Sequence, residues 1–225
     1  MCNLYSSTTT QEAMRQLFDV PADRDHLGNF APLSAIYPKY SGPVVRLNSE
    51  GRRELVAMHW GFPMPQVSKK TGKPILPKAI NNARDDKLQS SPFWRGSFEE
   101  RRCLVPATSF CEAKGRNPAN YYWFGLDDPD PDARPPFAFA AIWRHWRGDI
   151  KGALVEMDAY SIITTSPNEL VRQIHPDRMP VILHPGAYEQ WINGAPGEAA
   201  ELLRPFPASR MRVVRSGDGV KEDVV

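Results

Sequence analysis

The chain of 225 residues is 41% hydrophobic and 24% charged, a balance typical of globular proteins that excludes a disordered chain. Its formal net charge of +2 neither demands nor excludes nucleic acid as a partner. The 22 prolines, about twice average usage, favour a loop-rich α+β or β architecture over a helical bundle, because proline interrupts helices. Nothing in the middle of the chain resembles a linker, so we expect one domain over residues 1–225.

Cysteine usage and apolar patterning bear on the compartment. The three cysteines, Cys2, Cys103 and Cys111, are an odd number and too few for a disulfide scaffold. Without a signal peptide they favour a reducing compartment, and a cytoplasmic protein is expected. The longest apolar run, residues 137–143, is too short to span a bilayer, so no membrane partner is expected. Neither a metal nor another cofactor is expected, because metal-ligand spacing is missing, and a monomer is favoured.

The first part of the chain predicts one helix and one hairpin. Residues 9–12, Thr-Thr-Gln-Glu, have the form of a capping box, and apolar residues at helical spacing follow, so a short helix is expected near 10–18. Residues 19–42, rich in Pro, Asp, Gly and Asn, are expected to form a long loop. Strands at 44–47 and 54–62 are expected to pair as a hairpin.

The middle of the chain is expected to be rich in strands. Residues 63–81 contain four prolines and two lysine-rich turns, which predict a mobile surface segment. An Asp- and Pro-rich loop is expected at 127–136. Further strands are predicted at 102–107, 109–113, 121–126, 137–146 and 153–165.

The strongest local signal is a helix start. The segment from Ser166 to Glu169 offers a Ser N-cap, Pro at the first helical position and Glu at the third, and this helix should stop before Pro176. A buried strand at 181–183 and a short helix near 187–192 follow, and 193–225 is expected to be a C-terminal extension or a last strand. Strands outnumber helices without βαβ alternation. The predicted class is therefore α+β, with a mostly antiparallel, barrel-like sheet system.

Cys2 is the first candidate for chemistry. If the initiator methionine is removed, Cys2 carries an α-amine and a thiol on adjacent carbons, with unperturbed pKa values of about 7.7–8.0 and about 8.5. Such a 1,2-aminothiol captures an aldehyde, because the amine forms a Schiff base and the thiol then closes a thiazolidine ring. The alternative is an incidental small residue at a frayed terminus.

Basic residues outnumber acidic ones between Val67 and Arg102. This excess fits either a solvated loop or a surface that tracks phosphates. Within it, Asn82 followed by Arg84 could pair an amide contact with a phosphate contact, or could form a turn beside a surface arginine.

Other residues are candidates for contacts with DNA. Trp94 lies beside Arg95 in the basic stretch and is a candidate for stacking on an unpaired base. Trp60 is a second stacking candidate, although strand alternation favours core packing for it. Arg178 fits either a phosphate contact or a structural ion pair.

Two residues are candidates for proton transfer. Glu112 ends an otherwise apolar pair of strands. If it is buried, its pKa should rise and suit it to proton shuttling, whereas a solvated Glu112 would simply mark the end of the strand. His175 lies at the end of the predicted helix, where a helix C-terminus would raise its pKa and make it a proton donor. The alternative is a His that caps the last carbonyls.

The order of these signals is more specific than any one of them. The order is Cys2, Trp60-Gly61, Asn82-Ala83-Arg84, Arg102-Cys103-Leu104-Val105-Pro106 leading to Glu112, and His175 with Arg178-Met179-Pro180-Val181-Ile182-Leu183. It closely resembles the SRAP family, the SOS-response-associated peptidases that process abasic sites. The resemblance runs from residue 2 to about residue 192.

The resemblance implies an α+β domain with a positively charged DNA groove. It implies that the initiator methionine is lost and that Cys2 then links to the ring-opened aldehyde of an abasic site in single-stranded DNA as a thiazolidine. The family's peptidase name implies that the protein removes its own first residue. Independently of the resemblance, the Schiff-base intermediate would permit β-elimination when ring closure fails, so an abasic-site lyase side activity is expected. Asn82 would orient Cys2 and the sugar, and Glu112 would move protons at the α-amine. His175 would protonate the sugar oxygen, and Arg84 would hold a backbone phosphate.

The chain also departs from the commonest pattern of the family. Asn3-Leu4 stands where Gly-Arg is frequent, and Cys111-Glu112-Ala113 replaces a frequent aromatic-Glu-Trp, which indicates a divergent bacterial branch. Two other functions are compatible with the sequence. One is an N-terminal-cysteine amide hydrolase whose own amine is the base, and the other is a non-catalytic reader of damaged single-stranded DNA.

Overall fold

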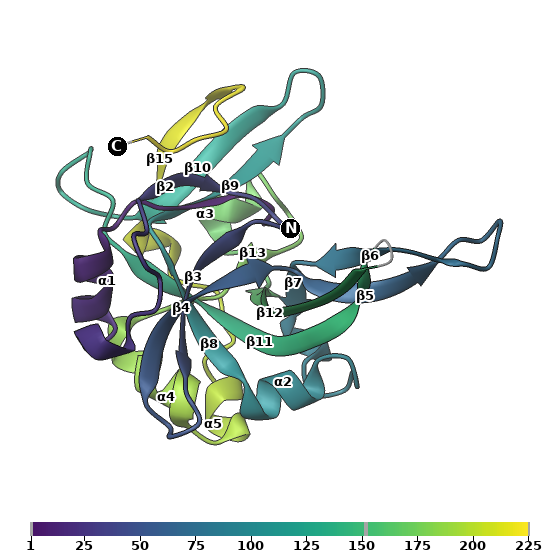
Figure 1. Ribbon diagram of the computed structural model, residues 1–225. Helices are drawn as coiled ribbons and strands as arrows, with labels where there is room; N and C mark the ends of the chain where they lie inside the picture. The colour runs from purple at the N-terminus through teal and green to yellow at the C-terminus, as the bar shows by residue number, and fades with distance from the viewer. Residues whose placement is uncertain (1, 151–152, 225) are drawn as a thin grey trace.

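A closed ring of strands forms the centre of the protein (Figure 1). The computed structural model describes residues 2–150 and 153–224. In the ring, β12 pairs with β4, β4 with β3, β3 with β8, β8 with β11, and β11 again with β12. The bounds are β3 (Ser41–Leu47), β4 (Arg53–Trp60), β8 (Arg102–Ala107), β11 (Phe137–Ile150) and β12 (Ala153–Thr165). Among these five pairings of the ring, only β12–β4 is parallel, so the predicted α+β class with a mostly antiparallel, barrel-like sheet is confirmed.

A second, antiparallel sheet carries the N-terminal strand. Its order is β15-β10-β9-β1-β2. The chain passes from the barrel into this sheet at Thr108, the single residue between β8 and β9. The bounds are β1 (Tyr5–Ser7), β2 (Leu33–Ile36), β9 (Ser109–Lys114), β10 (Asn120–Leu126) and β15 (Met211–Asp218). The C-terminal part of the chain therefore supplies a last strand, β15.

The helices are short and lie around the barrel. Apart from turns of 3-10 helix, they are α1 (Gln11–Leu17), α2 (Arg95–Glu100), α3 (Glu169–Arg172), α4 (Tyr188–Asn193) and α5 (Pro196–Ala200). Short strands attach to the ring, namely β7 (Asn82–Arg84), β13 (Met179–Pro180) and β14 (Ile182–Leu183). In the part of the chain that the structure describes, no helix has the length and apolar character needed to cross a membrane.

Alternate residues of the barrel strands feed two apolar clusters, as strand geometry requires. Leu104 packs with the cluster that includes the helical residues Phe98 and Trp191. Its neighbours Cys103 and Val105 belong to the cluster that includes Tyr5 and Cys2.

Tyr5 anchors the N-terminal strand to the barrel. Its ring lies 5.1 Å from that of Trp60 and 5.7 Å from that of Phe139, in edge-to-face contacts. Its hydroxyl lies 2.6 Å from the hydroxyl of Tyr160. These three partners come from β4, β11 and β12, so the strand that follows Cys2 is fixed against three strands of the ring.

Two predicted helix starts have different outcomes. The helix expected near 10–18 forms as α1, with the Thr10 side chain accepting from Ala13 N at 3.3 Å. The N-cap of α3 is Asn168, whose side chain accepts from Val171 N at 2.9 Å, so the prediction of Ser166 as the cap is wrong. The Asn168 amide makes the capping bond and also donates to Phe206 O at 2.8 Å, a contact distant in the chain that fixes the start of the helix there.

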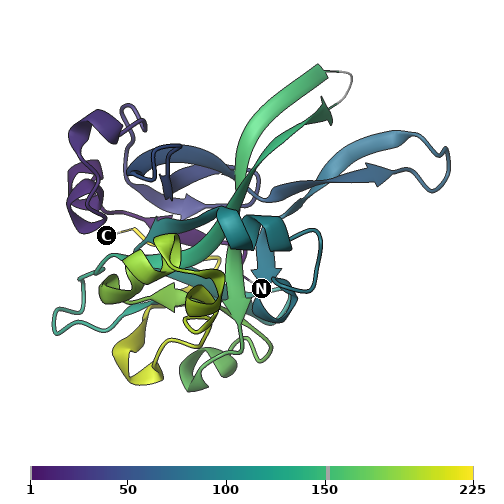
Figure 2. The same ribbon diagram turned by 90° about the horizontal axis from the view of Figure 1, so that it is seen from below.

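Two segments predicted as irregular contain strands. The loop expected at 19–42 includes β2, which forms by pairing with β1, a long-range partner that local composition does not reveal. The mobile segment expected at 63–81 is a hairpin of β5 (Phe62–Val67) and β6 (Pro74–Ile80). Its four prolines are tolerated because a two-stranded sheet has only edge strands. Figure 2 shows this hairpin and the β11–β12 hairpin projecting from the barrel.

The strand predicted to run to residue 62 instead ends at Trp60. Gly61 has a φ of +121°, and a Cβ there would lie 2.8 Å from the Cβ of Ala79. The backbone therefore turns at a position that only glycine fits, and β5 begins just beyond it.

Candidate active site

Backbone contacts hold Cys2 in the interior. The residue is fully buried, and its thiol lies 3.6 Å from Leu4 O. Two amide side chains donate to the Cys2 carbonyl, Asn82 at 2.7 Å and Asn81 at 3.0 Å. The interpretation of Cys2 as a residue in a frayed terminus is therefore wrong, because Cys111 N also donates to Leu4 O at 2.9 Å and continues the sheet toward the chain start.

Asn82 reaches Cys2 because β7 runs parallel to β12, with Asn82 opposite Ile162. The side chain is only 9% exposed. Its Oδ1 is buried and has no hydrogen-bond partner among the described residues. A buried acceptor of this kind is costly to leave unmatched, so the site offers a place for a donor beside the Cys2 backbone.

Glu112 is the acidic group of the site. It lies on β9 and is 5% exposed, so the buried alternative of the two sequence interpretations is confirmed. Burial raises the pKa of its carboxyl to about 7. Burial and the nearby Glu112 charge together raise the pKa of the Cys2 thiol well above its usual value, so the thiol is held in its protonated form.

His175 follows α3, and its backbone N–H donates to Val171 O at 2.8 Å. Burial lowers the pKa of the ring, so the prediction that the helix end would raise it is wrong. The reason is that α3 has only four residues, which gives a weak dipole against the cost of desolvation. Arg178 N lies 3.2 Å from Nδ1 and donates to it, which places the proton of the neutral ring on Nε2.

A pocket of about 460 Å³ lies next to these groups. Glu112 and His175 form part of its wall, together with Asn3 and Leu4, the residues that follow Cys2. Asn82 contacts Cys2 directly. The structure thus brings together the four residues that the sequence assigned to catalysis, although Cys2 itself does not line the pocket.

The two tryptophans assigned to DNA contacts lie in the core, which corrects that assignment. Trp60 is fully buried, and its ring stacks on that of Tyr160 with 6.3 Å between the ring centroids. Its Nε1 donates to Asn81 O at 2.9 Å. Trp94 is 8% exposed and packs against Phe62, with 5.3 Å between the ring centroids. Neither indole presents a face to a base, and Trp60 instead fixes one of the amides that hold Cys2.

The arginines differ in how available they are. Arg178 donates to Asp85 at 2.6 Å and is 14% exposed, which corresponds to the structural ion pair rather than a phosphate contact. Arg84 is 55% exposed and forms two hydrogen bonds with Asp86, at 2.9 and 3.0 Å. Arg95 is exposed at the start of α2.

Sequence reasoning missed several residues of this region. Asn81 was detectable as the neighbour of Asn82 in an Asn-Asn pair. Tyr37, Tyr121 and Lys221 line the pocket but come from distant parts of the chain, and no local pattern marks them.

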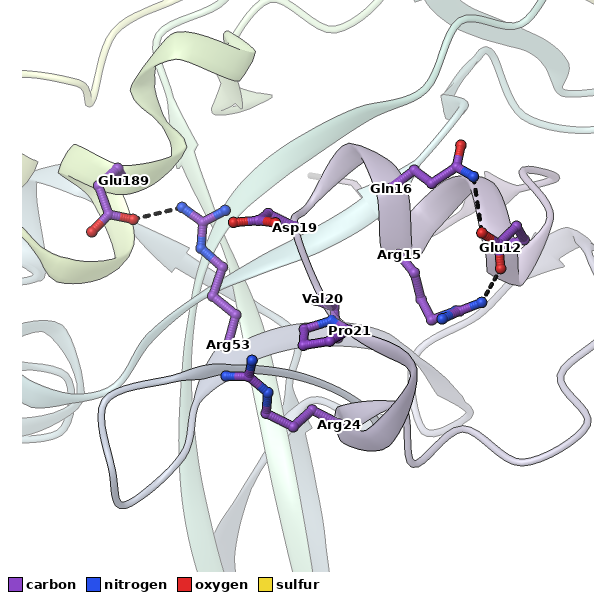
Figure 3. A pocket seen from close by; sticks show the side chains of 9 residues that line it. All are labelled: Glu12, Arg15, Gln16, Asp19, Val20, Pro21, Arg24, Arg53 and Glu189. Carbon is purple, nitrogen blue, oxygen red and sulfur yellow. Dashed lines mark hydrogen bonds and ion pairs between the residues drawn. The ribbon is translucent and has the colours of Figure 1, made fainter.

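Another pocket, of about 390 Å³, lies against α1 and α4 (Figure 3). Its charged groups are largely paired with one another. Arg53 donates to Glu189 at 2.6 Å, and Arg15 pairs with Glu12. The described residues that line it include no cysteine or histidine, so they offer no thiol or imidazole nucleophile.

The comparisons with known proteins identify the family of the chain. Residues 1–222 match the family described as SOS response associated peptidase (SRAP), and the chain belongs to this family.

Individual relatives have a low sequence identity to this chain. The chain is 29% identical over 203 residues to the abasic site processing protein YoqW of Bacillus subtilis, covering 86% of this chain and 85% of that protein. It is 27% identical over 202 residues to the abasic site processing protein HMCES of Gallus gallus, covering 79% and 60%.

Solved structures share the fold. A crystal structure from Bordetella bronchiseptica has a TM-score of 0.71 at 25% identity and covers 96% of this chain and 99% of that one. A structure from Bacteroides thetaiotaomicron has a TM-score of 0.72 at 22% identity, covering 96% and 91%.

Proposed function

We propose that this protein processes abasic sites in single-stranded DNA by capturing them covalently through Cys2. The observation that carries the proposal is the pair of amides on the Cys2 carbonyl, next to a pocket whose wall contains Glu112 and His175. The names of the related proteins YoqW and HMCES support the same substrate.

The proposed chemistry begins with hydrolysis of the Met1–Cys2 peptide bond, which is the autopeptidase step and leaves a free α-amine. The amine adds to the C1 aldehyde of the ring-opened sugar, and loss of one water gives a Schiff base. The thiol of Cys2 then adds to the C=N bond, and its proton moves to the nitrogen. The product is a thiazolidine in which nitrogen and sulfur are both bonded to C1, and no oxidant or reductant is consumed.

The state of the thiol favours this order of steps. Burial holds the Cys2 thiol protonated, so it is a poor first nucleophile, and the amine attacks before it. The thiol then closes the ring within one residue, which is an intramolecular step with a high effective concentration.

The other groups take roles that fit their contacts. Glu112, with a pKa of about 7, exchanges a proton readily near neutral pH and serves as acid and base at the amine and at the carbinolamine. His175 donates its Nε2 proton to the sugar oxygen during ring opening. Asn82 fixes the Cys2 carbonyl through Nδ2, and its buried Oδ1 accepts from the amine or from a sugar hydroxyl.

A basic arm supports single-stranded DNA as the partner. We call residues 67–84, which include the tip of the β5–β6 hairpin and all of β7, the basic arm. It contains no acidic residue and ends at Asn82 and Arg84, and its hairpin part projects from the body in Figure 2. Its cations are Lys69, Lys70, Lys73, Lys78 and Arg84. A phosphate backbone along this arm would lead directly to the pocket, and a single copy of the chain contains all the groups that the proposal uses.

The Schiff base also accounts for a lyase side activity. When ring closure fails, the imine permits β-elimination of the 3′ phosphate. We expect strand scission from a Cys2→Ala protein that has lost Met1, since its amine remains.

The test is a denaturing gel of the protein with a single-stranded oligonucleotide carrying one abasic site, paired with the mass of the protein's N-terminus. Wild type lacking Met1 should give a heat-stable shifted band, and Cys2→Ala should give none. Cys111→Ala is the matched control, because it removes a buried thiol near the pocket and should still give the band. If no band forms with a free Cys2, abasic-site capture is wrong. Hydrolysis of N-terminal peptide bonds and binding without reaction would then be the functions to measure.

A further inference from the structure

Part of the pocket beside Cys2 has no role in the proposed chemistry. Its lining includes Glu112 and His175, and also Tyr37 and Tyr121, which both lie against Lys221. Among the described residues that line the pocket, the lysine is the only fully cationic side chain, and the two tyrosines supply the aromatic surface. The proposed acid–base chemistry does not account for this combination of a lysine and two tyrosines in the pocket wall.

The segment that carries Lys221 is fixed although it forms no regular structure. Asp223 is fully buried and accepts from Ser109 Oγ at 2.6 Å and from Arg134 Nε at 3.0 Å. Two residues earlier than Asp223, the Lys221 carbonyl accepts from Tyr37 at 3.2 Å. A buried carboxylate with two charge-assisted or hydroxyl partners is a strong anchor, because removing it would leave Arg134 without its counterion. The position of Lys221 is therefore set by the fold.

The surroundings of the Lys221 side chain indicate that it binds a ligand outside the protein. Its backbone is held, but the residue is exposed, and among the described residues its ammonium has no carboxylate within ion-pair distance. Its Nζ lies 5.8 Å from the centre of the Tyr121 ring. A cation beside an aromatic face matches the two chemical parts of a nucleotide, an anionic phosphate and a flat base.

We propose that this wall is the subsite for the nucleotide that adjoins the abasic residue, with Lys221 contacting its phosphate and Tyr121, together with Tyr37, stacking on its base. The inference rests on the proposed function, since it assumes that the abasic sugar enters the same pocket. An abasic residue has no base to stack, so binding of the neighbouring nucleotide would hold the reactive sugar near Glu112 and His175.

Binding without chemistry tests the subsite. The probe is a labelled single-stranded oligonucleotide with one tetrahydrofuran residue, an abasic analogue that has no aldehyde, and the measurement is fluorescence anisotropy over a range of salt. We expect Lys221→Met to weaken binding about three- to tenfold and to reduce the slope of log K against log salt by about 0.7, the value for one phosphate on a single strand. Tyr121→Leu should weaken binding about tenfold, and Tyr121→Phe should bind as wild type does, because stacking needs the ring and not the hydroxyl.

The matched control is Arg52→Met, which removes an exposed positive charge at the turn before β4, the end of that strand opposite Trp60. A second arm replaces the phosphates on either side of the lesion, one at a time, with neutral methylphosphonates. At one linkage the difference between wild type and Lys221→Met should vanish, which also identifies the side of the lesion. The proposal is wrong if Lys221→Met binds like Arg52→Met, or if no single linkage removes the difference.

The two proposals fail separately. Covalent capture by wild type without any effect of Lys221→Met on binding would overturn the subsite alone. Lys221-dependent binding without covalent capture would overturn the chemistry alone. Melting temperatures of all variants, expected to match wild type for the exposed Lys221 and Arg52, exclude loss of fold as the cause.

Discussion

Replacing Glu112 by Gln separates the electrostatic cost of the site from its chemistry. The carboxyl has an ordinary pKa of 4.5 and one of about 7 in the folded protein, because burial penalises its charged form. The folded state therefore holds the proton more tightly than the unfolded state. The stability linked to this group is fully present below about pH 4.5 and is lost as the pH rises through about 7. The difference between these two pKa values lowers the free energy of unfolding by at most about 3 kcal/mol at high pH.

Urea unfolding of wild type, Glu112→Gln and Glu99→Gln between about pH 5 and 8 measures this effect. Gln resembles the protonated acid and does not titrate, so the unfolding free energy of Glu112→Gln should exceed that of wild type increasingly as the pH rises. Glu99 is exposed on α2, and its Gln variant should follow wild type at each pH. Parallel pH profiles for wild type and Glu112→Gln would refute the buried, proton-holding carboxyl.

The same variant tests catalysis. Loss of a general acid–base group slows reactions by about 10² to 10⁴. We expect the rate of covalent capture by Glu112→Gln to fall in this range at neutral pH, while the affinity for the tetrahydrofuran oligonucleotide stays near that of wild type. An unchanged capture rate would exclude Glu112 from the proton transfers.

Three further predictions concern other parts of the protein. Asn82→Ala removes the 2.7 Å hydrogen bond to the Cys2 carbonyl. The free energy of unfolding should fall by about 1 kcal/mol, whereas the rate of covalent capture should fall at least tenfold. A capture rate equal to that of wild type, measured where the variant is folded, would mean that Asn82 is only structural. Trp94→Ala should lower the unfolding free energy by about 3–5 kcal/mol without changing DNA affinity at a temperature where the variant is folded, and a selective loss of affinity would restore the stacking hypothesis. Changing Lys69, Lys70 and Lys73 together to Gln should reduce the salt slope of single-strand binding by up to about 2, and an unchanged slope would show that the basic arm does not contact phosphates.

Local sequence signals predicted the elements whose determinants are local. The helix after Thr10 and the hairpin of β3 and β4 follow from capping and alternation. The strands β2, β5 and β6 were not predicted, because β2 exists only by pairing with β1 and because prolines mask an edge hairpin. The cap at Asn168 depends on its contact with Phe206, which lies far along the chain.

Candidate residues were easier to find than their environments. Cys2, Asn82, Glu112 and His175 were identifiable in the sequence, but whether Glu112 was buried or solvated remained open until the fold placed it on β9. The pKa of His175 was predicted in the wrong direction because helix length and burial, rather than position, decide it. Lys221 had no local signal, since its place is fixed by contacts with distant parts of the chain, those of the buried Asp223 and the hydrogen bond from Tyr37.

The anchoring of Tyr5 has a consequence for when the protein is reactive. Tyr5 meets Trp60, Phe139 and Tyr160, which belong to three different strands and reach each other only when the ring is closed. Under the proposed function, a partly folded chain that has lost Met1 would present its aminothiol without the two amides and the buried acid, and would behave toward aldehydes like a free cysteine peptide. Selectivity for the abasic aldehyde would then be a property of the completed fold, acquired cooperatively and lost in the same transition.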